Sequence, residues 1–256
     1  MNIMIDVGNT NITIGITNKH NVLNSFRLTT NNVQTEDELG STIINLLTLN
    51  NIDYKQITGS VLSSVVPKLN NIIIKCLYKY FSIIPIIVGP GIKTGIKLLF
   101  DNPREVGADR IVNVVAAQKL YNRNTLVIDF GTATTFDYIS DKGEFEYTVI
   151  TPGIETALKA IVSNAAKLVD VEITKPKSIL TKNTISGMQA GLVYGYIGQV
   201  EYIVNKIKEE INKDIYVVCT GGLSNIIYDN TNVIDEYHPN LAYIGMEYIY
   251  EYNTSK

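Results

Sequence analysis

Short runs in which apolar and polar residues alternate open each half of the chain, and longer runs with helical spacing follow them. The alternating runs are typical of half-buried strands, whereas apolar positions repeating every three or four residues favour helices packed on a core. For the first half the pattern predicts strands at 2–7, 12–18, 22–28, 59–63 and 84–88, and helices at 36–49 and 68–81.

The second half repeats this order. The pattern predicts strands at 125–130, 134–140, 144–149 and 215–219, a helical stretch from about 153, a helix at 186–212 and a closing helix from 241. Three antiparallel strands followed by alternating helices and strands, twice over, predict two α/β domains packed across a cleft. We expect the domains to span residues 1–117 and 118–256.

A short motif also occurs twice. Residues 6–11 read DVGNTN and residues 129–134 read DFGTAT, and each copy directly follows an apolar run. The acidic residue, the glycine and the hydroxyl and amide groups suit a tight turn around phosphate groups. An acidic residue followed by glycine also occurs in ordinary hairpin turns, but two copies at matching positions favour phosphate binding. A third glycine element, Gly221-Gly222, follows the strand at 215–219 and suits close approach to a flat ligand.

The segment between the two halves contains a second group of polar residues. Pro103 and Gly107 indicate a loop, and the helix that follows would carry Asp109 and Arg110 in its first turn. Asp109 could be a base for an acceptor hydroxyl and Arg110 a clamp for a carboxylate or phosphate. The alternative is structural: Asp109 would cap the helix and Arg110 would pair with Glu105.

Composition limits the kind of partner. The 256 residues are 45% hydrophobic and 18% charged, with a net charge of −3, so we expect a soluble globular protein. Lysine and arginine are scattered and form no basic stripe, which argues against nucleic acid. No apolar run is long enough for a membrane span and no signal peptide is evident, so we expect a cytoplasmic protein without membrane association. The two cysteines and two histidines are too dispersed for a disulfide framework or a zinc site.

These motifs together resemble those of type III pantothenate kinases, in the superfamily that includes acetate and sugar kinases, chaperone ATPases and actin. The resemblance covers nearly the whole chain. The segments that carry it are DVGNTN at 6–11, SSVVP at 63–67, DNPREVGADR at 101–110, DFGTAT at 129–134, PG at 152–153, NT at 183–184, GYIGQV at 195–200 and TGG at 220–222. The block that ends in Gly107-Ala108-Asp109-Arg110 is the most discriminating of them.

The resemblance implies two duplicated ribonuclease H-like, actin-like ATPase domains around a nucleotide-binding cleft. It implies ATP-dependent phosphorylation of pantothenate to 4′-phosphopantothenate, the first step of coenzyme A biosynthesis, with magnesium accompanying the ATP. The residues it assigns to ATP are Asp6, Val7, Gly8, Asn9, Thr10, Asn11, Ile12, Thr13 and Thr132. Those it assigns to pantothenate are Phe100, Gly107, Ala108, Asp109, Arg110 and Thr184.

Within these sets the resemblance gives three residues special roles. Asp109 would be the catalytic base. Asp129 would bind a monovalent cation, potassium or ammonium. Thr184 would contact the substrate of the neighbouring subunit, which implies a homodimer.

Two departures from the family pattern bear on these roles. Phe100 stands where the family has tyrosine, so a phenolic hydrogen bond to the substrate is lost. Tyr147-Thr148 replaces a Gly-Gly pair and places bulk where the family keeps the backbone exposed, which affects the expected loop there.

Two other functions stay open: a non-enzymatic ATP-binding regulator of the same superfamily, and an acetate or sugar kinase.

The helix at 186–212 carries an apolar stripe that could form the subunit interface. Its members are Leu192, Val193, Tyr196, Ile197, Val200, Ile203 and Val204. Helical spacing fits both an isologous contact between subunits and burial in the domain's own core. The resemblance to a dimeric family favours the interface.

Overall fold

The computed structural model describes residues 1–165 and 168–255, which form two compact units. Unit 1 consists of Met1–Leu120 and Asn240–Lys256, and unit 2 of Tyr121–Pro239. The first boundary lies close to the expected one, after residue 117. The structure differs from the prediction for the C-terminal segment, which we expected in the second domain and which belongs to unit 1.

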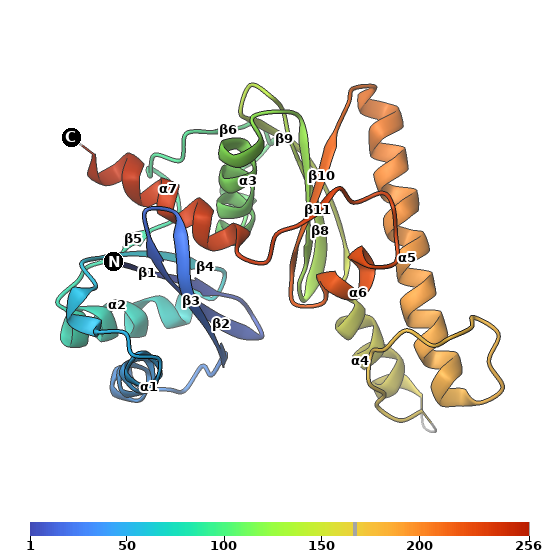
Figure 1. Cartoon of the computed structure of the whole chain (residues 1–256), viewed down its shortest axis with the longest axis horizontal. Coiled ribbons are helices and arrows are strands. Elements are labelled where there is room, and N and C mark those ends of the chain that lie inside the picture. The colour runs from blue at the N-terminus through green and yellow to red at the C-terminus, as the bar shows by residue number, and fades with distance from the viewer. Residues whose placement is uncertain (166–167, 256) are drawn as a thin grey trace. The chain divides into compact units, whose positions relative to one another are not determined.

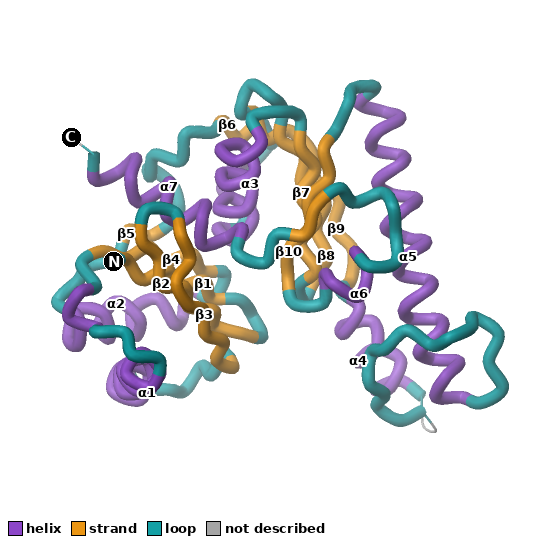
Figure 2. The backbone as a smooth tube through the Cα atoms, viewed as in Figure 1, coloured by secondary structure: helices purple, strands orange, loops and turns teal. Residues whose placement is uncertain are grey.

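Unit 1 is built on a five-stranded sheet in the order β3-β2-β1-β4-β5 (Figures 1 and 2). Strand β1 pairs antiparallel with β2 and parallel with β4. The strands are β1 (Asn2–Val7), β2 (Asn11–Asn18), β3 (Asn21–Thr29), β4 (Gly59–Ser64) and β5 (Ile86–Ile87), and the short β6 (Lys97–Leu98) follows in the chain. The helices are α1 (Glu36–Leu49), α2 (Pro67–Phe81), α3 (Ala108–Tyr121) and α7 (Leu241–Thr254), with 3-10 turns η1 (Tyr54–Gln56) and η2 (Pro103–Glu105).

Unit 2 repeats the same topology. Its strands run in the order β11-β10-β7-β8-β9, and β7 pairs antiparallel with β8 and parallel with β10, as β1 does with β2 and β4. The strands are β7 (Thr125–Phe130), β8 (Ala133–Ile139), β9 (Glu144–Pro152), β10 (Tyr216–Gly221) and β11 (Glu236–Tyr237). The helices are α4 (Ile154–Asn164), α5 (Thr184–Ile211) and α6 (Ser224–Tyr228). The duplication read from the sequence is therefore present in the strand order.

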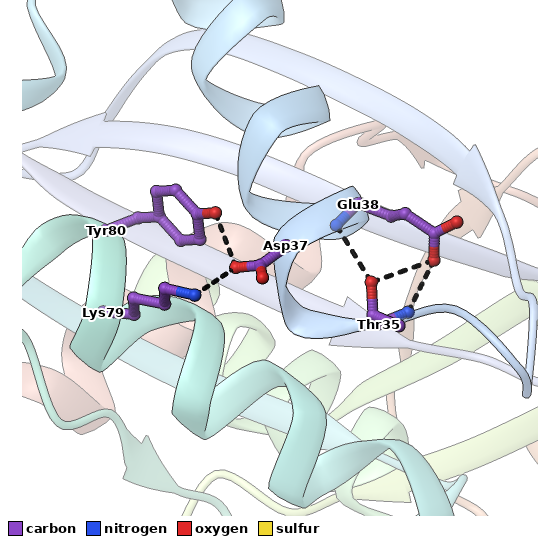
Figure 3. Close-up of polar contacts among 5 residues, drawn as sticks. All are labelled: Thr35, Asp37, Glu38, Lys79 and Tyr80. Carbon is purple, nitrogen blue, oxygen red and sulfur yellow. Dashed lines mark hydrogen bonds and ion pairs between the residues drawn. The ribbon is translucent and has the colours of Figure 1, made fainter.

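Helix α1 begins at its predicted residue because the sequence supplies a complete capping box. The Thr35 hydroxyl accepts the Glu38 N–H at 3.2 Å, and the Glu38 carboxylate accepts the Thr35 N–H at 2.7 Å (Figure 3). Asp37 then accepts hydrogen bonds from Lys79 and Tyr80 of α2, each at 2.6 Å. These two bonds hold the pKa of the exposed Asp37 carboxyl below its usual value and join α1 to α2.

The two faces of the unit 1 sheet have different covers. Ile3, Ile5 and Val7 of β1 pack into the core with α1 and α2. The alternate residues face α7, where Asn2 of β1 donates to the Glu247 carboxylate at 3.0 Å and Thr17 of β2 also donates to it. Sequence periodicity indicated the helix of α7 but not the sheet that it covers.

Glycines let α7 approach its neighbours closely. A Cβ on Gly245 would lie 1.8 Å from the Val112 carbonyl oxygen of α3, and a Cβ on Gly15 would lie 2.6 Å from the Tyr243 ring. The backbones are therefore closer than any larger residue permits at these two points. This packing places α7 in unit 1.

The apolar stripe of α5 forms the core of unit 2 and not a free interface. Val193, Val200 and Val204 are fully buried, and Tyr196 and Ile197 are less than a tenth exposed, all in one cluster with β7, β8 and β10. The interpretation of this stripe as a subunit contact was wrong. The reason is that helical periodicity shows that one face is buried but does not identify what buries it.

Several shorter elements also differ from the prediction. Strand β5 covers only Ile86–Ile87, and α6, β6 and β11 were not predicted. Strand β9 begins at the predicted residue and continues past the predicted end to Pro152, so Tyr147 and Thr148 lie in the predicted strand, paired with Tyr138 and Asp137. The Tyr147 ring stacks on Tyr138 at 6.0 Å, which accommodates its bulk. Among the helices of the described residues, none combines the length and the apolar content needed to cross a membrane.

We expect Gly245→Ala to lower the free energy of unfolding by about 1–3 kcal/mol, because its methyl group would collide with the Val112 carbonyl. The matched control is Gly191→Ala in α5, where nothing lies within 4 Å and alanine should stabilise the helix by about 1 kcal/mol. Urea denaturation of both variants measures the two changes. Equal stability of Gly245→Ala and the wild type would contradict the close contact.

Candidate active site

The first phosphate motif forms the hairpin turn between β1 and β2. The Gly8 N–H donates to the Asn11 carbonyl at 2.9 Å, and a Cβ on Gly8 would lie only 3.3 Å from that oxygen. Thr30, just after β3, donates its hydroxyl to the Gly8 carbonyl at 2.7 Å and its N–H to the Thr10 carbonyl at 2.9 Å. The backbone of the turn is thus fixed by bonds from two strands, and its polar side chains project from a rigid base.

Asp6 is the penultimate residue of β1, between the buried Ile5 and Val7. The residue is half-buried, and removal of its carboxyl group from water is the main cause that raises its pKa to about 7. A hydrogen bond from the Ser63 hydroxyl at 2.7 Å opposes this rise, and the negative charge of Asp109 adds to it. Asp6 and Asp109, far apart in the sequence, are therefore close enough in unit 1 to influence each other's charge.

Asp109 is positioned by the turn that precedes α3. Asn102 caps η2 by accepting the Arg104 N–H at 3.3 Å and donates to Glu105 at 2.7 Å. A Cβ on Gly107 would lie 2.5 Å from Asp109 Oδ1, so glycine leaves room for the carboxylate. That oxygen accepts the Arg110 N–H at 2.8 Å in the first turn of α3. Asp109 therefore lies inside the first turn of α3, where a negative charge is favourable, and bonds the adjacent N–H, alongside its place near Asp6.

Arg110 and Phe100 form the neighbouring part of unit 1. The Arg110 guanidinium lies over the Phe100 ring, 5.8 Å from its centroid. Phenylalanine therefore keeps the aromatic surface that a tyrosine would offer to the guanidinium, without the hydroxyl. The Asp6–Thr13 hairpin, Phe100 and Gly107–Arg110 all belong to unit 1.

The second phosphate motif forms the turn between β7 and β8 in unit 2. The Gly131 N–H donates to the Ala133 carbonyl at 3.2 Å, so the glycine closes this turn as Gly8 closes the first, in a turn one residue shorter. The Thr132 carbonyl accepts the Gly153 N–H at 3.0 Å and the Thr156 hydroxyl at 2.6 Å, both from the start of α4. A Cβ on Gly153 would lie 2.2 Å from the Gly131 carbonyl oxygen, so only glycine allows α4 to begin there.

Asp129 lies beside the third glycine element. Gly221 has a φ of +102°, and a Cβ there would lie 2.7 Å from Asp129 Oδ1 and 2.6 Å from the Phe130 carbonyl oxygen. The Gly221 backbone thus passes close to the Asp129 carboxylate and to the carbonyl oxygen and N–H of Phe130, and the two oxygens are donors of a kind that suits a hard cation. Within the described residues no three His, Cys, Asp or Glu side chains form a metal-binding group.

Thr184 lies elsewhere in unit 2, at the first position of α5. Asn183 caps this helix by accepting the Ser186 N–H at 2.9 Å, and the Thr184 side chain is exposed. Apolar neighbours on both sides are exposed as well: Leu180 is 86% and Ile185 51% accessible. Ile179 nearby is 62% accessible, so exposed apolar side chains gather around the start of α5.

Two residues near Asp6 had no role in the sequence interpretation. Ser63 was recognised as part of a motif, but nothing in the sequence shows that it faces Asp6. Tyr243 of α7 is buried, and its pKa is raised by burial and by Asp6 and lowered by a hydrogen bond with Thr13. The signal for Tyr243 was weak, because a tyrosine on a C-terminal helix does not indicate which strand it contacts.

Comparison with known proteins decides the family. The family model described as type III pantothenate kinase matches residues 2–206. A type III pantothenate kinase from Bacillus cytotoxicus is 47% identical over 251 residues, which is 98% of this chain and 96% of that protein.

The chain belongs to the type III pantothenate kinase family. It is therefore a kinase, a phosphotransferase that uses ATP to phosphorylate pantothenate in the synthesis of coenzyme A.

Solved structures agree with this family in their fold. A putative Baf family transcriptional activator from Campylobacter jejuni aligns with a TM-score of 0.59 at 18% identity, over 99% of this chain and all of that one. A putative 2-dehydro-3-deoxygalactonokinase from Sinorhizobium meliloti aligns with a TM-score of 0.57 at 9% identity, over 100% and 98% of the two chains. The pantothenate kinase chain thus has the predicted α/β fold with two ribonuclease H-like domains of the actin-like ATPase class.

Proposed function

We propose that this pantothenate kinase transfers the terminal phosphoryl group of ATP to the primary hydroxyl of pantothenate, with Asp109 as the base. The observation that carries the proposal is the place of the turn before Asp109, where Gly107 lies against Val65, whose N–H bonds Val7 beside Asp6 at the phosphate-binding hairpin. A carboxylate near the phosphate end of the nucleotide site is where an acceptor hydroxyl must lose its proton. The product would be 4′-phosphopantothenate.

The other residues act by positioning and by charge. The hairpin from Asp6 to Thr13, with Thr132, would hold the ATP phosphates through backbone N–H groups and hydroxyls. Arg110 and the backbone from Gly107 would hold the carboxylate of pantothenate, with Phe100 packing against the substrate. Magnesium would accompany the ATP and neutralise the charge that develops on the transferring phosphoryl group. We place the reaction in the cytoplasm.

The Asp109 site distinguishes this function from the alternatives. A regulator that only binds ATP needs a phosphate hairpin but no carboxylate beside the acceptor, and the family assignment favours pantothenate over a sugar or acetate.

We expect Asp109→Asn to lower kcat by at least about 100-fold, because the amide cannot accept the hydroxyl proton. The binding of ATP should change little, since the substituted group lies on the acceptor side. A coupled assay of ADP release with pantothenate, together with calorimetric titration of ATP, measures both effects. The control is Asp101→Asn in the exposed loop before η2, which should keep full activity. Near wild-type turnover of Asp109→Asn would show that Asp109 is not the base and acts only in the structure of the helix start.

We further propose that Asp129 binds a monovalent cation, potassium or ammonium. Support comes from the carboxylate and the Phe130 carbonyl oxygen that meet where Gly221 lacks a side chain. A cation there would neutralise negative charge beside the second phosphate turn.

Activity should then rise at least about tenfold when potassium replaces sodium at matched ionic strength, and Asp129→Ala should lose both the activity and this response. The control, Asp141→Ala in the exposed turn before β9, should respond to potassium as the wild type does. Equal rates in the two salts would count against a cation site.

We also propose a homodimer in which Thr184 reaches the pantothenate site of the other subunit. The exposed apolar side chains on either side of Thr184 support it, in place of the buried stripe of α5. Ile179, Leu180 and Ile185 would be covered in such a dimer.

Mixing two inactive variants tests this arrangement. Asp109→Asn and Thr184→Arg each damage every site of their own dimers, but a mixed dimer regains one intact site of the two. Random exchange of equal amounts should restore about a quarter of wild-type activity. Complete inactivity after demonstrated subunit exchange would show that each site is built within one chain.

A further inference from the structure

The end of strand β4 contacts both acidic parts of the site in unit 1. Ser63 lies opposite Asp6 in the parallel pairing of β4 with β1, and its hydroxyl donates to Asp6 Oδ1 at 2.7 Å. Ser63 is fully buried. A hydrogen bond to a carboxylate in such a place is shielded from competing water, so it fixes the direction of the carboxyl group.

The next residues of β4 reach the turn that carries Asp109. The Val65 N–H donates to the Val7 carbonyl at 3.0 Å, which continues the β1–β4 pairing past Ser64. Val65 Cγ1 would lie 3.5 Å from a Cβ on Gly107. The segment from Ser63 to Val65 is therefore a shared support for the Asp6 hairpin and for the turn before α3.

Several groups face Asp6 from the elements around it. Asp109 comes from α3 and raises the pKa of Asp6, whereas the Ser63 hydroxyl from β4 lowers it. Tyr243 comes from α7, where burial and the charge of Asp6 raise its pKa, and Arg27 of β3 lowers it. Ser63 is the neighbour of Asp6 that stabilises its charged form through a direct hydrogen bond.

We propose that Ser63 is a positioning residue of this kinase, which holds the Asp6 carboxylate as an oriented anion beside Asp109. This inference rests on the proposed function, since it assigns the oriented carboxylate to the phosphate-transfer site. Ser63 acts through Asp6 and does not itself touch the reacting groups.

The role has a consequence for stability that does not depend on turnover. Without the hydroxyl, the pKa of folded Asp6 rises further, so the folded protein loses stability wherever Asp6 must be charged. The wild type and Ser63→Ala should therefore differ little at pH 5, where Asp6 carries its proton in the folded state. They should diverge as the pH rises through about 7.

The experiment is a double-mutant cycle with Ser63→Ala, Asp6→Asn and the double variant, measured by urea unfolding at pH 5 and pH 8. We expect Ser63→Ala to lower the folding equilibrium constant about tenfold more at pH 8 than at pH 5. In the Asp6→Asn background this dependence on pH should vanish. A loss that is the same at both pH values, or the same in both backgrounds, would show a packing role only and overturn the proposal.

Kinetics supply the second readout. In Ser63→Ala, kcat should fall about tenfold. The acidic limb of its pH profile should move to higher pH, because the Asp6 carboxyl loses its proton only at a higher pH. The control is Ser60→Ala in the same strand. Ser60 is also buried, and its hydroxyl has no hydrogen-bond partner among the described residues, so its removal should leave activity and both pH profiles unchanged.

The two hypotheses fail in different ways. A wild-type protein without pantothenate-dependent ADP release would refute the proposed function. Wild-type turnover together with an unchanged kcat and pH profile in Ser63→Ala would refute only the role of Ser63.

Discussion

The burial of a carboxylate at the end of β1 is the constraint on which the site in unit 1 depends. Asp6 lies next to the last residue of a strand whose alternate residues, Ile3 and Ile5, lie in the core, so the sheet that supplies stability also removes the carboxyl group from water. Partial desolvation strengthens every charge interaction of Asp6, including its repulsion from Asp109. The hydrogen bond from the Ser63 hydroxyl offsets part of the free energy needed to keep the Asp6 carboxylate charged in this place. The carboxylate lies next to the hairpin that would hold the ATP phosphates.

The duplication extends to the residues beside each acidic group. Asp6 is paired with Thr13 on β2 and Ser63 on β4, and the register of unit 2 pairs Asp129 with Thr135 on β8 and Thr220 on β10. Each acidic residue thus lies between two hydroxyl-bearing neighbours in the same sheet position. The halves diverge one residue later, because unit 2 has Gly221 next to Asp129 while unit 1 continues with Ser64. Related frameworks therefore place one carboxylate against a hydroxyl donor and the other against the backbone of a glycine.

The sequence was most informative where local signals act alone. The capping box at Thr35 and Glu38 fixes the start of α1, and the repeated motif located both hairpins. It failed where the answer depends on contacts between distant segments. The stripe that contains Val193 is periodic whether a partner subunit or its own sheet covers it. Strand β5 covers only the two residues that pair with β4, and that pairing is not visible in the apolar run.

The same reasoning applies to the site. The residue types around Asp109 indicated a base, but its closeness to Asp6 arises from the contact of the turn before α3 with the end of β4, beside β1, which no spacing in the sequence encodes. The partnership of Ser63 with Asp6 follows from the register between β1 and β4, and register is a property of paired strands.

Helix α7 imposes an order on the assembly of the chain. Unit 2 is continuous in sequence, so all residues of its core belong to one stretch of chain. One face of the unit 1 sheet is covered by α7, which follows unit 2 in the sequence. During synthesis, the face of the sheet that carries Asn2, Gly15 and Thr17 therefore stays exposed until unit 2 has been made. Removal of α7 would expose this face of the sheet and take Tyr243 away from the surroundings of Asp6, so the cover of the sheet and the environment of the carboxylate depend on the same helix.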